Sequence, residues 1–240
     1  MMKAKPPKIL RLHSPSRFAA FTSLKPSDMS IDKFEKGMVS LLRRLGVPAE
    51  KLVYARQVHG AKILAVRSPV FKNLQEADGF VANKQGYLLS IFTADCLPVV
   101  LFDAKKNCIG AVHCGWRGSY KGIAKNAVLR MKRLYGSNPR DIQVRFGPSI
   151  QKCCYEVSPE LGVKFADRFG KSCVQKRDGK LFLDLERANE TLLVRCGIPK
   201  KNIIKNPHCT MCRKDLFYSY RRDGKGTGRM VTSIMLKKSL

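Results

Sequence analysis

Residues 97–113 read LPVVLFDAKKNCIGAVH, and this stretch decides the fold. Residues 97–102 and 108–113 are runs rich in apolar and β-branched residues, each of the length of a buried strand. Between them, residues 103–107 have the composition of a turn. The pattern therefore predicts two strands, with the second running back after the turn.

The rest of the chain adds helices and further strands around this pair. Helical spacing and end signals predict helices at residues 29–45, 121–134, 159–169 and 185–196. Ser158 is the expected N-cap of the third helix, because Pro159 suits the first helical position. Further strands are predicted at residues 9–12, 52–56, 62–66, 87–92, 142–146, 217–220 and 230–235, with Asp178-Gly179 as a hairpin turn.

The order of these segments indicates the fold class. Strands occur in hairpin-like groups with helices between them, and neither a GxGxxG motif nor a P-loop is present. This favours an α+β fold with mixed sheets over a doubly wound parallel sheet. Because the chain contains no repeat and no Gly/Ser linker, we predict a single domain over residues 1–240.

Composition and charge restrict the class of protein. No apolar run approaches the roughly 18 residues that cross a bilayer, and the N-terminus lacks the apolar core of an export signal. We therefore expect a cytoplasmic protein that does not enter membranes. The net charge of +28 should attract anions such as phosphate and favours non-specific binding to nucleic acid. Nothing in the sequence indicates the oligomeric state.

Nine cysteines include an adjacent pair, Cys153 and Cys154, and a CxxC motif formed by Cys209 and Cys212. Without an export signal, reduced thiols and metal ligands are expected rather than a disulfide framework. His208 next to the CxxC motif suggests a zinc knuckle. Because no second pair stands at zinc-finger spacing, the alternative of two buried thiols in a loop is favoured.

Candidate metal ligands stand at the ends of predicted strands. His113 ends an apolar run, Cys96 follows another, and His59 precedes Gly60, whose small size permits close approach. Two imidazoles and one thiolate suit Zn²⁺ and leave a fourth tetrahedral position open, as in catalytic zinc sites. The long spacings between these residues do not identify a metal site by themselves.

Six ordered motifs carry a family resemblance. They are RQVHG at 56–60, TADCLP at 93–98, HCGWRG at 113–118, GPSIQKCCYEV at 147–157, Asp184-Leu185, and FYSYRRDGKGTGR at 217–229. This set closely resembles the YfiH-like family, also called the laccase-domain or polyphenol oxidoreductase family, over roughly residues 50–236. The resemblance implies a layered α/β/β/α fold. It also implies that His59, Cys96 and His113 bind the metal.

The family carries more than one activity. One is copper-dependent oxidation of polyphenols. Another is phosphorolysis of adenosine, inosine, guanosine and methylthioadenosine, together with adenosine deamination. Some bacterial members are linked instead to the editing of peptidoglycan precursors. A multicopper oxidase ligates several coppers mostly through imidazole, and four histidines cannot supply such a cluster. We therefore favour the nucleoside activity, with Zn²⁺ at the single site and Cu²⁺ as the alternative ion.

Several residues receive roles under this hypothesis. Arg56 or Arg117 is expected to hold phosphate, because a guanidinium binds it through two hydrogen bonds. Asp95, beside Cys96, is assigned to proton transfer or to support of the ligand, with a turn-capping carboxylate as the alternative. Cys96 and His113 are the catalytic candidates, and Cys96 would act as a nucleophile only without metal, because coordination engages the thiolate.

The resemblance has two departures. The family usually begins with Arg-Gly-Gly and Asn-Leu-Gly segments, whereas residues 18–28 have neither and residues 1–49 are shortened, which implies a more open pocket. Cys114 stands where the family more often has alanine, and we interpret it as a packed small residue. A further alternative is a basic RNA-associated protein that has kept the fold and lost the activity.

Overall fold

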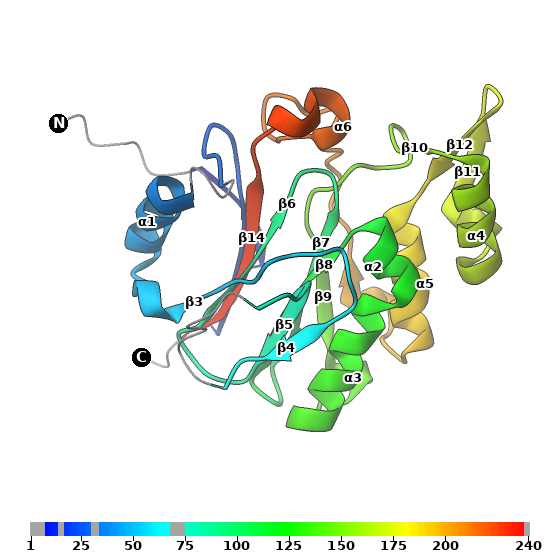
Figure 1. Ribbon diagram of the computed structural model, residues 1–240. Helices are drawn as coiled ribbons and strands as arrows, with labels where there is room; N and C mark the ends of the chain where they lie inside the picture. Colours follow the sequence, from blue (N-terminus) through cyan, green and yellow to red (C-terminus); the bar gives the residue numbers. More distant parts are fainter. Residues whose placement is uncertain (1–7, 14–16, 30–33, 68–74, 238–240) are drawn as a thin grey trace.

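The computed structural model describes residues 8–13, 17–29, 34–67 and 75–237, and Figure 1 shows its helices on both sides of packed sheets. In the described part of the chain the strands form three sheets. One has the order β1-β2-β14-β6-β3, formed by Ile9–His13, Phe18–Ser23, Met230–Leu236, Leu88–Thr93 and Leu52–Val53. Another has the order β13-β9-β7-β8-β5-β4, formed by Ile203–Ile204, Gln143–Phe146, Leu97–Asp103, Cys108–Cys114, Gly79–Ala82 and Ile63–Ala65. The third has the order β10-β12-β11, formed by Glu156–Val157, Lys180–Leu183 and Val174–Arg177.

The α-helices within the described ranges are α1 Phe34–Leu45, α2 Trp116–Lys121, α3 Ile123–Tyr135, α4 Pro159–Phe169, α5 Leu185–Arg195 and α6 Tyr220–Asp223. Short 3₁₀ turns connect some of the elements, at Ala49–Lys51, Pro139–Asp141, Lys171–Cys173, Lys200–Asn202 and Gly224–Gly226. No helix in these ranges is both long enough and apolar enough to cross a bilayer.

The predicted pair of strands forms the centre of the six-stranded sheet. β7 and β8 pair antiparallel, from Leu97 opposite Cys114 to Asp103 opposite Cys108. The Asp103 carboxylate closes the turn, because its Oδ1 accepts the backbone N–H groups of Lys105 (2.8 Å) and Lys106 (3.1 Å). This part of the prediction is confirmed.

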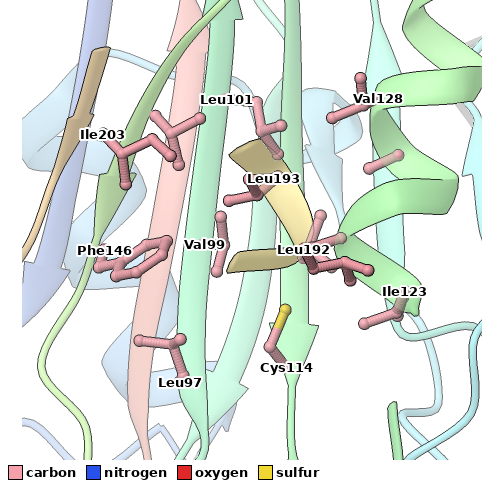
Figure 2. Close-up of a cluster of buried hydrophobic side chains, with 14 of the residues drawn as sticks. Leu97, Val99, Leu101, Cys114, Ile123, Val128, Phe146, Leu192, Leu193 and Ile203 are labelled. Atoms are coloured by element: carbon pink, nitrogen blue, oxygen red, sulfur yellow. The ribbon is translucent and has the colours of Figure 1, made fainter. Parts of the chain in front are cut away.

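Both faces of β7 are buried, which explains its uninterrupted apolar sequence. Val99 and Leu101 lie in the core against the helices, whereas Val100 and Phe102 lie in the core between the sheets. Successive strand residues face opposite sides, so one strand contributes to two cores. Figure 2 shows Val99 and Leu101 close to Leu193 of α5, with Val128 of α3 beside them.

The cores define the layers. Between the two larger sheets, Leu89 and Ile91 of β6 pack with residues of β5, β7 and β8. On the outer face of the five-stranded sheet, Met38 and Leu41 of α1 pack against Leu88. Helices α3 and α5 cover the outer face of the six-stranded sheet. The order is therefore helix, sheet, sheet, helix, and the predicted layered α+β fold with mixed sheets is confirmed.

The last strand lies in the middle of a sheet. β14 pairs with β2 on one side and β6 on the other, both antiparallel. Buried hydroxyls join the three strands: Thr22 Oγ1 lies 2.8 Å from Thr232 Oγ1, and Ser90 Oγ lies 2.7 Å from Ser233 Oγ. Strands near the two ends of the chain therefore pair within one sheet. The predicted strand pattern did not indicate this pairing.

The local predictions succeed where an end signal is present. α4 spans the predicted residues 159–169, and the Ser158 side chain accepts the Leu161 N–H at 3.3 Å. The strand predicted at 217–220 is wrong, because Ser219 caps the short helix α6 by accepting the Arg222 N–H. The elements that were not predicted are β2, β5, β10, β13 and α2. α1 begins at Phe34 among the described residues, and residues 30–33 of its predicted range lie outside them.

That residues 1–240 form one domain stays a prediction.

Candidate metal centre

Three segments converge at one end of the β7–β8 pair. His59 lies in the loop between β3 and β4, Cys96 lies in the short link from β6 to β7, and His113 lies in β8 opposite Pro98. The ligand atoms of these three side chains all lie within 4.8 Å of one another. The Cys96 Sγ atom is 3.9 Å from His59 Nε2, and the two imidazole rings lie 4.8 Å apart between centroids. The three predicted ligands therefore form a group that could hold a metal ion.

A buried carboxylate, Asp78, holds two of the three ligands. Its Oδ1 accepts a hydrogen bond from the His59 backbone N–H at 2.9 Å and lies 2.8 Å from His113 Nδ1. Its Oδ2 accepts from the Gly60 backbone N–H at 2.7 Å. Asp78 has no exposed surface, and His113 is 2% exposed. A carboxylate bound to Nδ1–H leaves the Nε2 of His113 as the ring atom with a free lone pair.

The His59 loop is held in an unusual backbone conformation. His59 has a φ of 57°, in the left-handed region that non-glycine residues seldom adopt. The side chain of Gln57 anchors the loop to β6, because its Nε2 donates to Phe92 O at 2.8 Å and its Oε1 accepts from Phe92 N at 2.7 Å. With Asp78, these bonds offset the cost of the conformation and direct His59, which is exposed, to the open side of the cluster.

Asp95 ties the Cys96 segment to the C-terminal part of the chain. Its Oδ1 accepts from Thr210 Oγ1 at 2.6 Å, and its Oδ2 accepts from the Arg221 backbone N–H at 2.7 Å. The φ of Asp95 is 92°, so the loop relies on these bonds to keep its shape. Because both carboxylate oxygens are engaged, this arrangement favours support of the neighbouring ligand over proton transfer.

Gly115, which directly precedes α2, lies against the candidate ligands and leaves no room for a side chain at its position. A Cβ atom there would lie 3.0 Å from His59 Cδ2 and 3.1 Å from Cys96 Sγ, closer than ordinary van der Waals contact. Gly118 allows a second close approach, because a Cβ there would lie 2.8 Å from Gly60 O. The start of α2 is therefore packed against both the His59 loop and the ligand atoms.

The charges of the cluster are mutually dependent. Burial raises the pKa of the Cys96 thiol, but the His113 charge and hydrogen bonds from both histidines outweigh it and lower the pKa to about 6. Burial lowers the pKa of His113, but the Cys96 charge and the Asp78 hydrogen bond outweigh it and raise the pKa to about 9. Burial also opposes ionisation of Asp78, yet His113 and the loop amides hold its pKa below the usual value. Without metal, a thiolate–imidazolium pair is favoured near neutral pH.

Arginines and an aromatic side chain lie near Cys96. The Arg117 guanidinium stacks 4.3 Å from the centre of the Trp116 ring, and Arg221 lies 5.3 Å from that of Tyr155. Burial and the Cys96 charge raise the pKa of Tyr155, while the charges of Arg221 and Arg117 act in the opposite direction. Arg56, the other predicted phosphate ligand, is exposed and forms an ion pair with Glu76 at 3.6 Å.

Sequence reasoning missed Asp78, and it assigned no site role to Tyr155 or Arg221. Asp78 precedes β5, whose sequence Gly-Phe-Val-Ala was not recognised as a strand. A carboxylate at the edge of an apolar run is a signal that was present. Tyr155 and Arg221 lie in motifs that carried the resemblance, but only the tertiary structure brings them near Cys96.

The sequence profile of the family described as multi-copper polyphenol oxidoreductase laccase matches residues 24–237, which include every residue of the cluster. The chain belongs to this laccase family. The match takes in β14 as well as the segments that carry the three candidate ligands, so it spans all the layers of the fold.

Relatives within the laccase family carry the names of nucleoside enzymes. Adenosine deaminase RL5, from an unknown prokaryotic organism, is 37% identical over 83% of this chain and 80% of its own length. A purine nucleoside phosphorylase of Clostridium acetobutylicum is 39% identical over 77% of this chain and 76% of its own. The crystal structure of YlmD from Geobacillus stearothermophilus has a TM-score of 0.89 and 28% identity, covering 99% of this chain and 98% of that protein.

Proposed function

We propose that this member of the laccase family is a metal-dependent purine nucleoside phosphorylase that also deaminates adenosine. Adenosine, inosine, guanosine and methylthioadenosine are the proposed nucleosides, and phosphate is the proposed second substrate. The observation that carries the proposal is the convergence of His59, Cys96 and His113 within 4.8 Å, on a side left open by the exposed His59. The names of the relatives support the nucleoside class.

Zinc is the proposed ion, with Cu²⁺ as the alternative. Two imidazoles and one thiolate are ligands that Zn²⁺ prefers, and three protein ligands leave a position for water or substrate. The donor set fits on two further observations: Asp78 orients His113, and the absence of a side chain at Gly115 keeps space beside the ligand atoms. A zinc ion held there would supply a Lewis acid.

The chain's own residues would bind and orient the substrates. Arg117, stacked on Trp116, and Arg221, beside Tyr155, present guanidinium groups that suit phosphate through paired hydrogen bonds. Arg56 is the weaker candidate, because Glu76 already pairs with it in an exposed position. Asp95 is proposed to position Cys96 through Thr210 and the Arg221 backbone.

A laccase reaction with several coppers is the less favoured activity. It needs many imidazole ligands, and the described cluster contains two, His59 and His113. His208 instead stacks against Phe217, with 5.8 Å between ring centres. The cytoplasm is the proposed location, since all nine cysteines are free thiols, which suits a reducing compartment.

The test offers adenosine to the purified protein with and without phosphate and separates the products by chromatography. We expect adenine and ribose 1-phosphate with phosphate, and inosine through deamination. His113→Ala is the background control. Cys96→Ser should lose the metal of this three-ligand site and the activity together. Metal-loaded protein that forms no product above the His113→Ala background would refute the proposal.

A second variant separates phosphate binding from the metal centre. Arg117→Ala should raise the KM for phosphate by roughly tenfold or more, the loss of one charge-assisted contact, and leave deamination nearly unchanged. Arg133→Ala, an exposed arginine on α3, is the matched control and should change neither reaction. Equal effects of both variants would exclude Arg117 as a phosphate ligand.

A further inference from the structure

A second group of sulfur atoms lies apart from the His59, Cys96 and His113 cluster. Cys153 and Cys154 lie in the turn before β10, and Cys209 and Cys212 lie in the loop after β13. The four Sγ atoms all lie within 4.8 Å of one another. Residues more than fifty positions apart in the sequence thus bring four thiols to one point, without a contribution from the ligands already described.

The spacing of the sulfur atoms indicates what they can bind. Cys153 Sγ and Cys154 Sγ lie 3.8 Å and 3.3 Å from Cys212 Sγ, and all four cysteines are free. A disulfide would bring two sulfurs to about 2.05 Å. Four sulfurs around a tetrahedral zinc with bonds of about 2.3 Å lie about 3.8 Å apart. The cluster is therefore near the size of a tetrahedral site.

Backbone hydrogen bonds hold the two loops together around the thiols. The Thr210 N–H donates to Ser149 O at 3.0 Å, and Ser149 forms a bridge with Cys209. The Cys154 N–H donates to Gln151 O at 2.9 Å. Backbone amides of Gln151, Met211 and Cys212 point toward Cys209 Sγ. Amide N–H groups directed at a sulfur stabilise a coordinating thiolate, in the way that second-sphere donors support metal ligands generally.

Charge compensation is also available. Four thiolates with one divalent ion carry a net charge of minus two. Arg177 donates to the backbone oxygen of Cys153 at 3.1 Å, and Lys152 precedes the pair in sequence. These cations lie at the cluster or next to it in the chain, so the charge of a four-thiolate site would not stand alone.

We propose that Cys153, Cys154, Cys209 and Cys212 bind a structural zinc ion. Four protein ligands leave no open position, which is typical of a structural site and unlike the three-ligand cluster. The ion would cross-link the loop that contains Cys153, Cys154 and Tyr155 to the loop that contains Cys209, Thr210 and Cys212. Thr210 donates a hydrogen bond to Asp95, which is next to Cys96 in the chain. This cross-link would therefore also stabilise the segment that carries Cys96, a proposed ligand of the three-residue metal site.

Metal analysis of purified, zinc-loaded protein tests the proposal. We expect two zinc ions per chain in the wild type and one in Cys212→Ser, whose mutated side chain is exposed. Cys96→Ser should also hold one zinc ion, because it loses the three-ligand site instead. The two variants therefore test the two sites independently. Cys196→Ser, a free thiol outside both clusters, is the matched control and should hold two. Equal zinc in the wild type and Cys212→Ser overturns the proposal.

Cobalt substitution of the wild type gives a second readout that needs no variant to fold. A four-thiolate site should add an intense sulfur-to-metal charge-transfer band in the near ultraviolet, stronger than one thiolate produces. Wild-type protein loaded with zinc in place of cobalt should release it when a mercurial reagent titrates the thiols. A spectrum with single-thiolate intensity, or a disulfide among the four cysteines in protein purified without oxidant, would overturn the proposal.

Discussion

Asp78 is not one of the three candidate metal ligands, but it fixes the positions of two of them. Its two oxygens receive the backbone N–H groups of His59 and Gly60 and contact His113 Nδ1, all within 2.9 Å. Every one of these contacts requires an acceptor, and a carboxylate is the side chain that accepts on both atoms. The same residue therefore orients one candidate metal ligand, His113, through its ring and another, His59, through its backbone.

We predict that Asp78→Asn weakens zinc binding by roughly 10- to 100-fold, the range typical for partners of metal ligands. The asparagine retains the shape but offers one acceptor oxygen in place of two, so the Gly60 or His59 N–H loses its bond. Competition with a chelator measures the affinity. Asp167→Asn, an exposed acidic residue on α4, is the control. An unchanged affinity in Asp78→Asn would contradict the assigned role.

Glu186 gives a prediction on pH and stability. It is 8% exposed, and its Oε1 has no hydrogen-bond partner among the described residues. Burial, with the nearby Asp184 charge, raises its pKa from 4.5 to about 7. A pKa raised on folding adds stability below pH 4.5, and this contribution is lost as the pH rises toward 7. The full difference is about 3 kcal/mol at 1.36 kcal/mol per pKa unit.

Glu186→Gln should therefore stabilise the protein at pH 8 relative to the wild type, and the gain should shrink toward pH 5. Denaturant unfolding at several pH values measures it. Glu190, one turn later on α5, is the contrasting case: Lys205 and Arg187 overcome its burial and lower its pKa. Glu190→Gln should destabilise at neutral pH. A Glu186→Gln gain that is the same at both pH values would show that its charge is not the cause.

At the scale of elements, the site is a junction of strand ends and one short helix. β7 and β8 supply a rigid pair with His113 beside the Cys96 loop, and the turn into α2 brings Gly115 against the ligand atoms. Side chains from separate strands meet because neighbouring strands end at the same edge of a sheet. The helix completes the site by its close packing against the His59 loop.

We predict that Gly115→Ala lowers zinc affinity and nucleoside activity together. The added methyl would lie 3.0 Å from His59 Cδ2 and 3.1 Å from Cys96 Sγ, so at least one ligand must move. Gly226→Ala is the control, since a Cβ there has no atom within 4 Å. Metal analysis and the adenosine assay measure both effects. Full zinc content in a folded Gly115→Ala protein would show that the space is not needed.

The charge belongs to the whole molecule. The 46 basic residues far exceed the 18 acidic ones, and the cluster of His59, Cys96 and His113 contributes no lysine or arginine to this surplus. A field of this size draws anionic ligands toward the protein from all sides. It suits a phosphate substrate, and it also predicts non-specific attraction to nucleic acid.

We therefore predict that the protein binds RNA weakly, with a log affinity that falls linearly as log salt rises. Longer oligonucleotides should bind more tightly, because more phosphates are neutralised per molecule. Fluorescence anisotropy with two lengths of RNA, over a range of salt concentrations, measures both trends. His113→Ala should bind equally well. If affinity does not depend on length, and phosphate competes for it, binding occurs in a single phosphate pocket instead.

Local sequence was sufficient for the central strands, the capped helix α4 and the hairpin turn at Asp178-Gly179, because each depends on neighbours in the chain. The motifs also indicated His59, Cys96 and His113 before their positions were known. The tertiary structure alone determines which residues from distant segments of the chain come into contact. Thr22 meets Thr232 in one sheet, Asp78 meets His113, and Cys154 meets Cys212. No local pattern encodes such contacts, because they depend on how segments that are far apart in the sequence pack as the apolar cores form.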